Sequence, residues 1–367
     1  MSFSNIFHNK VVIVSGHSGF KGSWLSIWLK QLGAHVIGIS DNSIVGRSNF
    51  VASDVSSIVD DHRFDIRDTN KVRDFIENVE PDFVFHLAAQ ALVRPSYENP
   101  IETITTNAIG TANVLDALRN LNKKVVAVMI TSDKVYDNVE WMWGYRETDR
   151  LGGKDPYSAS KGMAELAIHT YIESFYSHSS SNIKVGIARA GNVIGGGDWA
   201  IDRIVPDCIK AWANGKSVDI RNPIATRPWQ HVLEPLSGYL CLAESLYLDG
   251  NNHGEAYNFG PSSNQNYSVG ELINEMSKYW SQVKWNDVSS DKGHVHEAGL
   301  LKLNCDKALF DLEWNPTLGF EETVKMTVEW YKAFYSNKKD SMYSYTVSQI
   351  DTYMKMAKLN NIVWSND

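Results

Sequence analysis

The sequence contains few cysteines. Only three, Cys208, Cys241 and Cys305, occur in a chain of 367 residues, and they lie far apart with no CxxC pair. A disulfide framework or a zinc site is therefore not expected, and no metal site is predicted. This cysteine usage fits a reducing, cytoplasmic compartment.

The sequence also lacks long apolar runs and blocks of basic residues. No apolar stretch reaches the roughly 18 residues that a membrane span needs. Residues Met1 to Lys10 are polar and lack the apolar core of a signal peptide. The net charge is −8. We therefore expect neither a membrane nor a nucleic acid as a partner.

The remaining composition is that of a globular protein, with 43% hydrophobic and 21% charged residues. The length suits one large domain or two intimately joined domains. Twelve tryptophans are many for this length. Some belong in a core, but surplus aromatic rings also suit a pocket for planar or sugar rings.

Short apolar runs alternate with amphipathic stretches, which predicts an α/β fold with a doubly wound parallel sheet. The predicted strands are Val11–Val14, Val36–Ile39, a short strand before Phe64–Asp68, Phe83–Leu87, Val125–Ile130, Val185–Arg189 and Ala256–Gly260. The predicted helices include Ser23–Lys30, Asn107–Leu118, one through Tyr157, Gly270–Trp280, Phe320–Phe334 and Val347–Leu359. The polar, serine-rich segment Asn42–Asp61 is predicted to be a surface loop or lid.

A glycine-rich turn, residues 16–22, joins the first strand to the first helix. This context is the one in which a dinucleotide-binding turn occurs. Gly16 would allow the tight turn, Gly19 the approach of a pyrophosphate, and Gly22 close packing of helix and strand. The helix N-terminus would then face the phosphates. A purely structural glycine turn is the alternative.

Candidate cofactor contacts follow other strands. Asp41 follows the second strand, where an acidic residue would bind the adenosine ribose hydroxyls and favour NAD over NADP; a plain loop carboxylate is the alternative. Asp65 and Ile66 could meet the adenine. Small residues at Ala88 and Ala89 would let a cofactor lie against the strand ends. His86, inside an apolar run, is predicted to be a buried core histidine.

Tyr157 and Lys161 are four residues apart, which places both side chains on one face of a helix. A lysine ammonium beside a phenol favours phenolate, so we predict a lowered pKa for Tyr157 and an acid/base role. A solvated helix face with a half-buried tyrosine is the alternative. Polar residues 131–134 follow a buried strand, where α/β sheets place their chemistry.

Together these motifs resemble the extended short-chain dehydrogenase/reductase family. Within it, segments such as residues 17–25, 131–138, 190–200 and 227–239 resemble the CDP-glucose 4,6-dehydratases, whose Ser-Asp-Lys form stands at Ser132–Lys134. Ser15 departs from the usual threonine, and the 39–49 loop differs from the family pattern.

The resemblance implies a Rossmann-type NAD-binding domain of residues 1–190, with returns around 230–260. It also implies a smaller, interleaved C-terminal substrate-binding lobe of residues 191–229 and 261–367. The implied cofactor contacts are Gly16, Ser18, Gly19, Phe20, Gly22, Asp41, Asp65, Ile66, Ala88, Ala89, Gln90, Asn107, Thr131, Tyr157, Lys161, Ala190 and Asn192. The candidate substrate contacts are Gln90, Asn192, Trp199, Arg203, Arg221, Arg227, Trp229 and His231.

The implied reaction converts CDP-D-glucose to CDP-4-dehydro-6-deoxy-D-glucose and water, with internal hydride transfer from C4 to C6. Tyr157 would take the C4 hydroxyl proton with help from Ser132, and Asp133 would protonate the departing C6 hydroxyl. Lys134 would act as base at C5, or would only stabilise the enolate while water or Asp133 moves the proton.

The resemblance further implies a homodimer or homotetramer and a role in the deoxysugar biosynthesis of surface polysaccharides such as lipopolysaccharide O-antigen. A dehydratase for another nucleotide hexose, a nucleotide-sugar 4-epimerase and an NAD-binding sensor or scaffold are the rival interpretations. An epimerase needs no acid/base pair for C5 and C6, so the Asp133–Lys134 pair favours dehydration.

Overall fold

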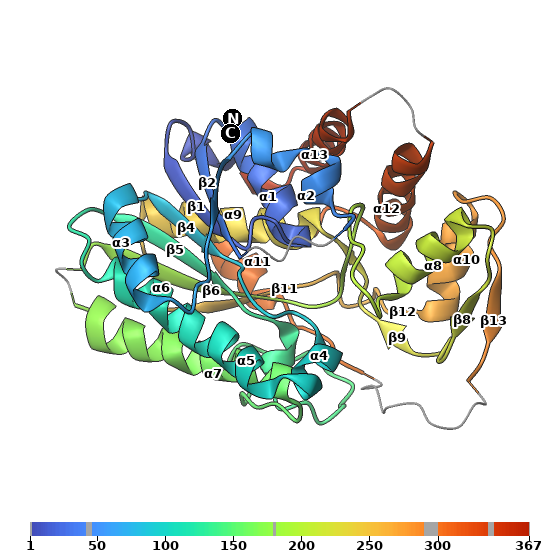
Figure 1. Ribbon diagram of the computed structural model, residues 1–367, viewed down its shortest axis with the longest axis horizontal. Coiled ribbons are helices and arrows are strands. Elements are labelled where there is room, and N and C mark those ends of the chain that lie inside the picture. The colour runs from blue at the N-terminus through green and yellow to red at the C-terminus, as the bar shows by residue number, and fades with distance from the viewer. Residues whose placement is uncertain (1, 42–45, 179–180, 290–299, 337–340, 367) are drawn as a thin grey trace.

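A seven-stranded parallel sheet forms the centre of the molecule (Figure 1). The computed structural model describes residues 2–41, 46–178, 181–289, 300–336 and 341–366. The strand order is β11-β6-β5-β4-β1-β2-β3, with every neighbouring pair parallel. The strands are β1 Val11–Ser15, β2 His35–Ser40, β3 Asp60–Arg63, β4 Phe83–His86, β5 Val125–Ile130, β6 Ile183–Ala190 and β11 Ala256–Phe259. The predicted doubly wound α/β fold is confirmed.

Helices cover both faces of the sheet, which is why its strands read as unbroken apolar runs. Alternate residues serve the two faces: Ile13 packs toward α3 (Thr69–Val79), α6 (Gly110–Leu118) and α7 (Pro156–Tyr171). Val12 and Val14 pack toward α1 (Phe20–Gln31) and α9 (Leu233–Leu248). The sheet therefore separates two apolar cores.

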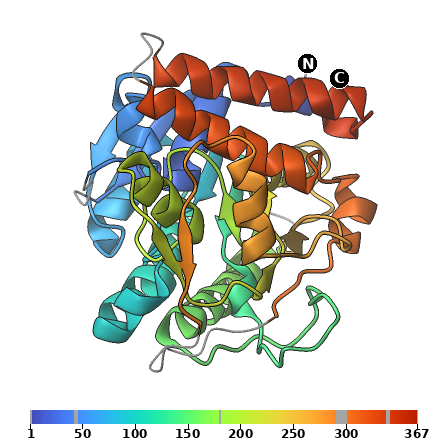
Figure 2. The ribbon, with the colours of Figure 1, turned by 90° about the vertical axis from the view of Figure 1, so that its right-hand side faces the viewer.

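A smaller lobe stands beside the sheet, at the right of Figure 1. Its elements are α8 Ile204–Ala213, β8 Val218–Ile220 paired with β13 Trp285–Asp287, β9 Thr226–Arg227 paired with β12 Tyr267–Ser268, and α10 Val269–Ser277. α12 (Phe320–Tyr335) packs on α10 and on α13 (Met342–Leu359). Figure 2 shows α12 and α13 side by side along one edge of the molecule.

The C-terminal helix α13 lies within residues 261–367, which the sequence analysis predicts as part of the lobe, and it packs against α1 of the Rossmann domain. The Trp364 ring stacks on Phe3 with centroids 4.8 Å apart, and Tyr353 lies edge-on to Trp28 at 5.7 Å. This segment therefore completes the core beneath the Rossmann sheet.

The predicted loop Asn42–Asp61 contains more structure than expected. Residues 42–45 lie outside the described part of the chain, but α2 (Asn49–Ala52) and a 3₁₀ turn (Val55–Ser57) follow. Phe50 is 4% and Val55 0% exposed. These two apolar side chains pack the segment onto the core. The serine content of the segment did not indicate this packing.

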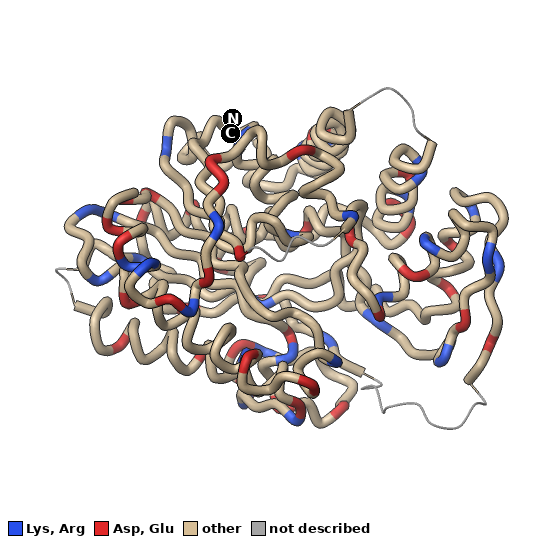
Figure 3. Tube along the Cα trace, in the orientation of Figure 1, with Lys and Arg blue, Asp and Glu red and all other residues tan. Residues whose placement is uncertain are grey.

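No helix in the described residues is long and apolar enough to cross a membrane. Basic and acidic positions are interspersed along the described chain (Figure 3).

Candidate functional site

The candidate site lies where the chain reverses direction in the sheet. β1, β2 and β3 extend to one edge, and β4 then returns to the other side of β1. In open α/β sheets ligands bind at the carboxyl ends of the strands beside such a switch point. The loops after β1, β4, β5 and β6 carry the predicted site residues.

The glycine turn after β1 fits a dinucleotide pyrophosphate. Gly16 has φ +76°, and a Cβ there would lie 2.7 Å from the Ala88 backbone nitrogen. A Cβ on Gly22 would collide with the Gly16 carbonyl. Gly19 caps α1 without any side-chain hydrogen bond, so the first helical N–H groups stay available for an anion.

The predicted adenosine side is less clearly defined. Ser18 Oγ and Ser40 Oγ lie 2.6 Å apart at the ends of β1 and β2, where ribose hydroxyls would arrive. Asp41 is exposed, and its backbone carbonyl accepts a bond from Arg63. An acidic side chain thus follows the end of β2, as the sequence predicts for a ribose contact.

Asp65 and Ile66 are already engaged within the protein. Arg67 Nε donates to Asp65 Oδ2 at 2.8 Å, and this bond holds the pKa of the Asp65 carboxyl below its usual value. The Ile66 side chain is 5% exposed and packs against Gly110. Any adenine contact here would have to use backbone groups or a displaced Asp65.

Asn107 joins the loop after β4 to α7. Its Oδ1 accepts from Gln90 N at 2.8 Å, and its Nδ2 donates to Ser160 Oγ at 2.8 Å. Asn107 lies in one π-helical turn, Thr105–Ile109, a feature often found at functional sites. The Gln90 side-chain amide bonds to Leu92 and Thr103, so it braces the loop beside Ala88 and Ala89.

His86 is a satisfied core histidine, as predicted. Its Nδ1 lies 2.8 Å from Ser15 Oγ and its Nε2 3.1 Å from Thr111 Oγ1. Burial lowers its pKa to about 3, with a smaller contribution from Lys161. Ser15, where the family usually has threonine, thus supplies a hydroxyl to this buried ring.

Tyr157 and Lys161 lie on one face of α7, which Asp155 caps through Ser158 N. The predicted lowering of the Tyr157 pKa was wrong: burial raises it to about 12, against the lowering effects of Ser132 and Arg203. Burial also lowers the pKa of Lys161 to about 8, while Glu165 raises it. In the protein alone, burial is therefore the largest influence on the pKa of both side chains.

Ser132, Asp133 and Lys134 follow β5 directly. Ser132 Oγ donates to Asp133 Oδ1 at 3.0 Å and accepts from Lys134 N at 3.2 Å. A Cβ on Gly191 would lie 3.0 Å from Asp133 Oδ2, so this position has little room for a larger residue. Among the described residues, no hydrogen bond or ion pair holds the Lys134 ammonium.

Behind these residues lies a buried ion pair. Arg189 Nε donates to Glu165 Oε1 at 2.8 Å, and their side chains are 2% and 0% exposed. Thr131 Oγ1 donates to the same carboxylate at 2.6 Å, and Arg189 Nη1 donates to Tyr136 at 2.7 Å. Arg189 is thus committed to Glu165, and Thr131 supports α7 through its hydroxyl.

Lys21 is a site residue that the sequence analysis missed. It is the second residue of α1, and its Nζ donates to Tyr239 Oη at 3.3 Å. Burial lowers its pKa to about 7; Arg203 and Lys161 lower it further and Asp133 raises it. The sequence offered one sign of this role: Lys21 is a lysine within the glycine turn, next to the apolar Phe20.

Of the predicted substrate contacts, Arg203 is close enough to Tyr157 to affect the phenol electrostatically. Its Nη1 pairs with Asp198 Oδ2 at 2.7 Å, and its charge acts on Tyr157. Arg227 is partly buried on β9 and Arg221 follows β8. Ala190 ends β6, and Asn192 follows it, with its carbonyl accepting from Gln230 N at 3.4 Å.

The aromatic candidates are part of the core. Trp229 is 5% exposed, and its indole N–H donates to Tyr267 O. His231 is fully buried, and burial lowers its pKa to about 3. Trp199 packs among aromatic rings of α12, with Phe334 4.8 Å away. Sequence alone cannot separate a stacking platform from a buried aromatic side chain.

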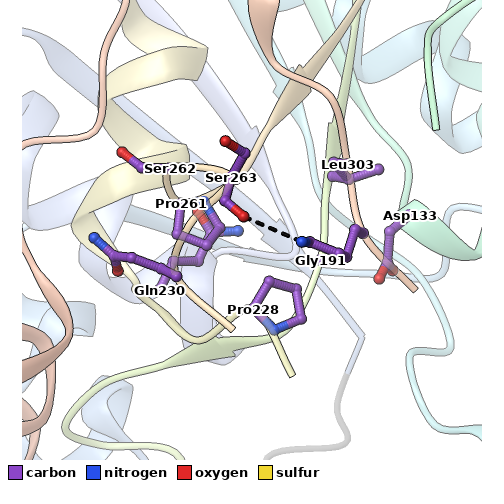
Figure 4. Close-up of a pocket in the computed structure, with 11 residues that line it drawn as sticks. Asp133, Gly191, Pro228, Gln230, Pro261, Ser262, Ser263 and Leu303 are labelled. Carbon is purple, nitrogen blue, oxygen red and sulfur yellow. Dashed lines mark hydrogen bonds between the residues drawn. The ribbon is translucent and has the colours of Figure 1, made fainter. Parts of the chain in front are cut away.

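A pocket opens beside Asp133 (Figure 4). Its lining includes Gly191, Pro228, the loop Gly260–Ser263, and Lys302 and Leu303. Lys302 donates from Nζ to Ser263 O at 3.1 Å, so two of the lining residues are joined by a hydrogen bond. The described residues contain no cluster of acidic, histidine or cysteine side chains that could hold a metal ion.

Comparison with known proteins gives consistent matches. A family model described as GDP-mannose 4,6-dehydratase matches residues 13–327. The chain is 45% identical over 334 residues to a CDP-glucose 4,6-dehydratase of Salmonella typhimurium, covering 90% of this chain and 92% of that protein.

Two solved structures illustrate the shared fold. A UDP-glucose 4-epimerase of Brucella ovis in complex with NAD gives a TM-score of 0.75 at 19% identity, covering 88% of this chain and 98% of that one. A dTDP-glucose 4,6-dehydratase of Bacillus anthracis in complex with NAD gives 0.73 at 20% identity, with 92% and 99% covered.

Proposed function

Because the chain belongs to the GDP-mannose 4,6-dehydratase family, we propose that it converts CDP-D-glucose to CDP-4-dehydro-6-deoxy-D-glucose and water. The observation that carries the proposal is the placement of Ser132, Asp133 and Lys134 directly after β5, with Ser132 acting on the buried Tyr157 phenol. A 4-epimerase would need only the tyrosine. The relative that shares 45% identity is named as the CDP-glucose enzyme.

The cofactor in this proposal is NAD, which would supply the hydride-transfer chemistry between C4 and C6 of the sugar. Gly16, Gly19 and Gly22 would leave room for its pyrophosphate at the start of α1. Ser18, Ser40 and Asp41 would face the adenosine ribose. The remaining predicted cofactor contacts stay part of this proposal.

The protein's own groups would move the protons. Tyr157 would take the proton of the C4 hydroxyl, and Ser132 would hold O4. Once C4 is a ketone, the C5 proton is acidic, and Asp133 would protonate the leaving C6 hydroxyl. Exposure of these three side-chain positions is low, at 7%, 6% and 4%, so bulk water would be largely excluded.

Lys134 would act at C5. A lysine accepts the C5 proton only as its neutral amine, which has a lone pair to offer. Lys134 is partly buried and its ammonium has no hydrogen-bond or ion-pair partner among the described residues, so it could turn toward the sugar. Its alternative role is to stabilise the enolate.

The test is incubation with a panel of nucleotide hexoses, scored for 4-keto-6-deoxy products. CDP-glucose deuterated at C4 should give product deuterated at C6, largely within the same molecule. A 4-epimer product, preference for another nucleotide, or accumulation of reduced cofactor in proportion to product would each contradict the proposal. Cofactor binding with no turnover of any hexose would support the sensor interpretation.

The proposal extends to assembly and setting. Apolar side chains on adjacent helices are exposed: Ile101 by 72%, Met163 by 42% and Leu166 by 60%. We propose that a second copy of the chain covers this face in a cytoplasmic homo-oligomer, and that the product serves deoxysugar biosynthesis for surface polysaccharide. Light scattering on Leu166→Lys should show a smaller particle than on the unaltered protein.

A further inference from the structure

The proposed dehydration leaves one proton to be moved inside the site. Oxidation at C4 removes a proton from O4 and gives it to Tyr157. Water leaves from C6, and its oxygen needs one proton more than the C6 hydroxyl carries; Asp133 supplies it. The C5 proton is taken and later replaced. After each turnover Tyr157 therefore holds one proton too many, and Asp133 one too few.

Ser132 interacts with both groups. Its Oγ donates to Asp133 Oδ1 at 3.0 Å, and its hydroxyl is close enough to Tyr157 to lower the pKa of the phenol. The Lys134 backbone N–H donates to Ser132 Oγ at 3.2 Å and so fixes the side-chain rotamer. A hydroxyl can accept one proton while it donates another, which makes it suitable as a bridge.

Solvent has little access to this chain of groups. Tyr157, Ser132 and Asp133 are 7%, 6% and 4% exposed, and Gly191 and Pro228 line the pocket on the Asp133 side. Figure 4 shows Asp133 at the margin of that pocket. A proton that had to leave from Tyr157 and return to Asp133 through bulk water would cross this packed surface twice.

We propose, on the basis of the proposed function, that Ser132 relays the O4 proton from Tyr157 to Asp133, so that the released water carries it. The Tyr157 Oη–H bond breaks as a new Oγ–H bond forms. The original Oγ–H proton passes to Asp133, which passes a proton to O6. The C6–O6 bond breaks with its electron pair on oxygen, and Tyr157 returns to phenolate.

The departing oxygen provides the driving force. Burial raises the pKa of the Tyr157 phenol to about 12, so the proton stays on Tyr157 until a stronger base appears. The oxygen leaving C6 approaches hydroxide, whose conjugate acid, water, has a pKa of about 15.7. Asp133 therefore needs to carry the proton only as the C6–O6 bond breaks.

The test compares Ser132→Ala, Ser132→Thr and the unaltered enzyme in single turnovers with CDP-glucose. If Ser132 is the relay, Ser132→Ala still oxidises C4 but loses water slowly. The absorbance of reduced nicotinamide should then rise toward one equivalent per site, while product formation falls by at least about 10²-fold. Ser132→Thr keeps the hydroxyl and should resemble the unaltered enzyme. Ser177→Ala, an exposed hydroxyl far from the site, is the control.

A hydrogen bond that only positions O4 predicts a different result. Oxidation and product formation would then fall together in Ser132→Ala, without accumulation of reduced nicotinamide, and that outcome would overturn the relay. Unchanged product formation would overturn it too. If Ser132→Ala does not fold, the unaltered enzyme in mixtures of H₂O and D₂O decides: a curved dependence of water loss on deuterium fraction supports several protons in motion, and a straight line contradicts it. Failure of the unaltered enzyme to turn over any hexose would instead count against the proposed function.

Discussion

Replacement of Lys161 by methionine should stabilise the protein while abolishing its activity. Lys161 is 7% exposed on α7, and burial lowers its pKa from 10.5 to about 8. The ammonium thus favours the unfolded chain, where water solvates it. Methionine has a similar length and no charge. Glu165 keeps its partners Arg189 and Thr131, so the substitution leaves no new buried charge unpaired.

The magnitude follows from the pKa difference. Each pKa unit corresponds to about 1.4 kcal/mol, so a fall from 10.5 to about 8 corresponds to roughly 3 kcal/mol. Between those pH values the unfolded chain binds more protons than the folded one, so stability of the unaltered protein rises with pH there. The advantage of Lys161→Met is therefore complete below pH 8 and disappears above about 10.5.

The assay is thermal unfolding of cofactor-free protein at pH about 7 and about 10, because a bound cofactor would stabilise the folded state by mass action. At roughly 2 °C per kcal/mol, the neutral-pH gain is about 6 °C. Lys161→Arg keeps the buried charge and should show no gain, and the exposed Lys30→Met should change stability by less than about 0.5 kcal/mol at either pH. A Lys161→Met protein that is no more stable than the original at neutral pH, or equally more stable at both, would refute the reasoning.

Three further substitutions test the site. Tyr157→Phe should retain the dinucleotide but lose at least about 10²-fold in turnover, because a positioned acid/base group is gone; near-normal turnover would remove Tyr157 from its role. Lys134→Met should still oxidise C4 but exchange the C5 proton slowly in deuterated water, and exchange at the original rate would assign the base elsewhere. Glu165→Gln leaves the buried Arg189 charge uncompensated and should cost about 3–5 kcal/mol in urea unfolding, whereas Asp207→Asn, at a partly exposed ion pair with Lys210, should cost less than about 0.5 kcal/mol. Equal losses in these last two variants would mean that burial of the pair matters little.

The sheet was predictable because each of its central strands is a run of consecutive apolar residues. The run Val125–Ile130 was predicted residue for residue, since a parallel strand covered on both faces needs apolar side chains in either direction. The glycine turn was predictable for a related reason. The backbone around Gly16 and Gly22 has no space for a side chain, so only glycine fits there and the sequence itself marks both positions.

Other features depend on distant parts of the chain. α9 was missed because it is buried on nearly every side and carries Pro235 and Gly238, so neither an amphipathic period nor helix propensity marks it. The direction of the Tyr157 pKa was missed because burial is a property of the whole fold, whereas the Tyr157–Lys161 spacing is local. Lys21 reaches the site only because α1 begins beside Tyr239.

The packing of the C-terminal segment on the first helix has a consequence for synthesis. Trp28 of α1 is covered by Tyr353 and Trp364, and Trp364 also covers Phe3. At about 5–20 residues per second, a ribosome needs on the order of 20–70 s to pass from Trp28 to Trp364. Throughout that time the nascent chain presents an uncovered tryptophan face, which chaperones can bind and which neighbouring nascent chains can join.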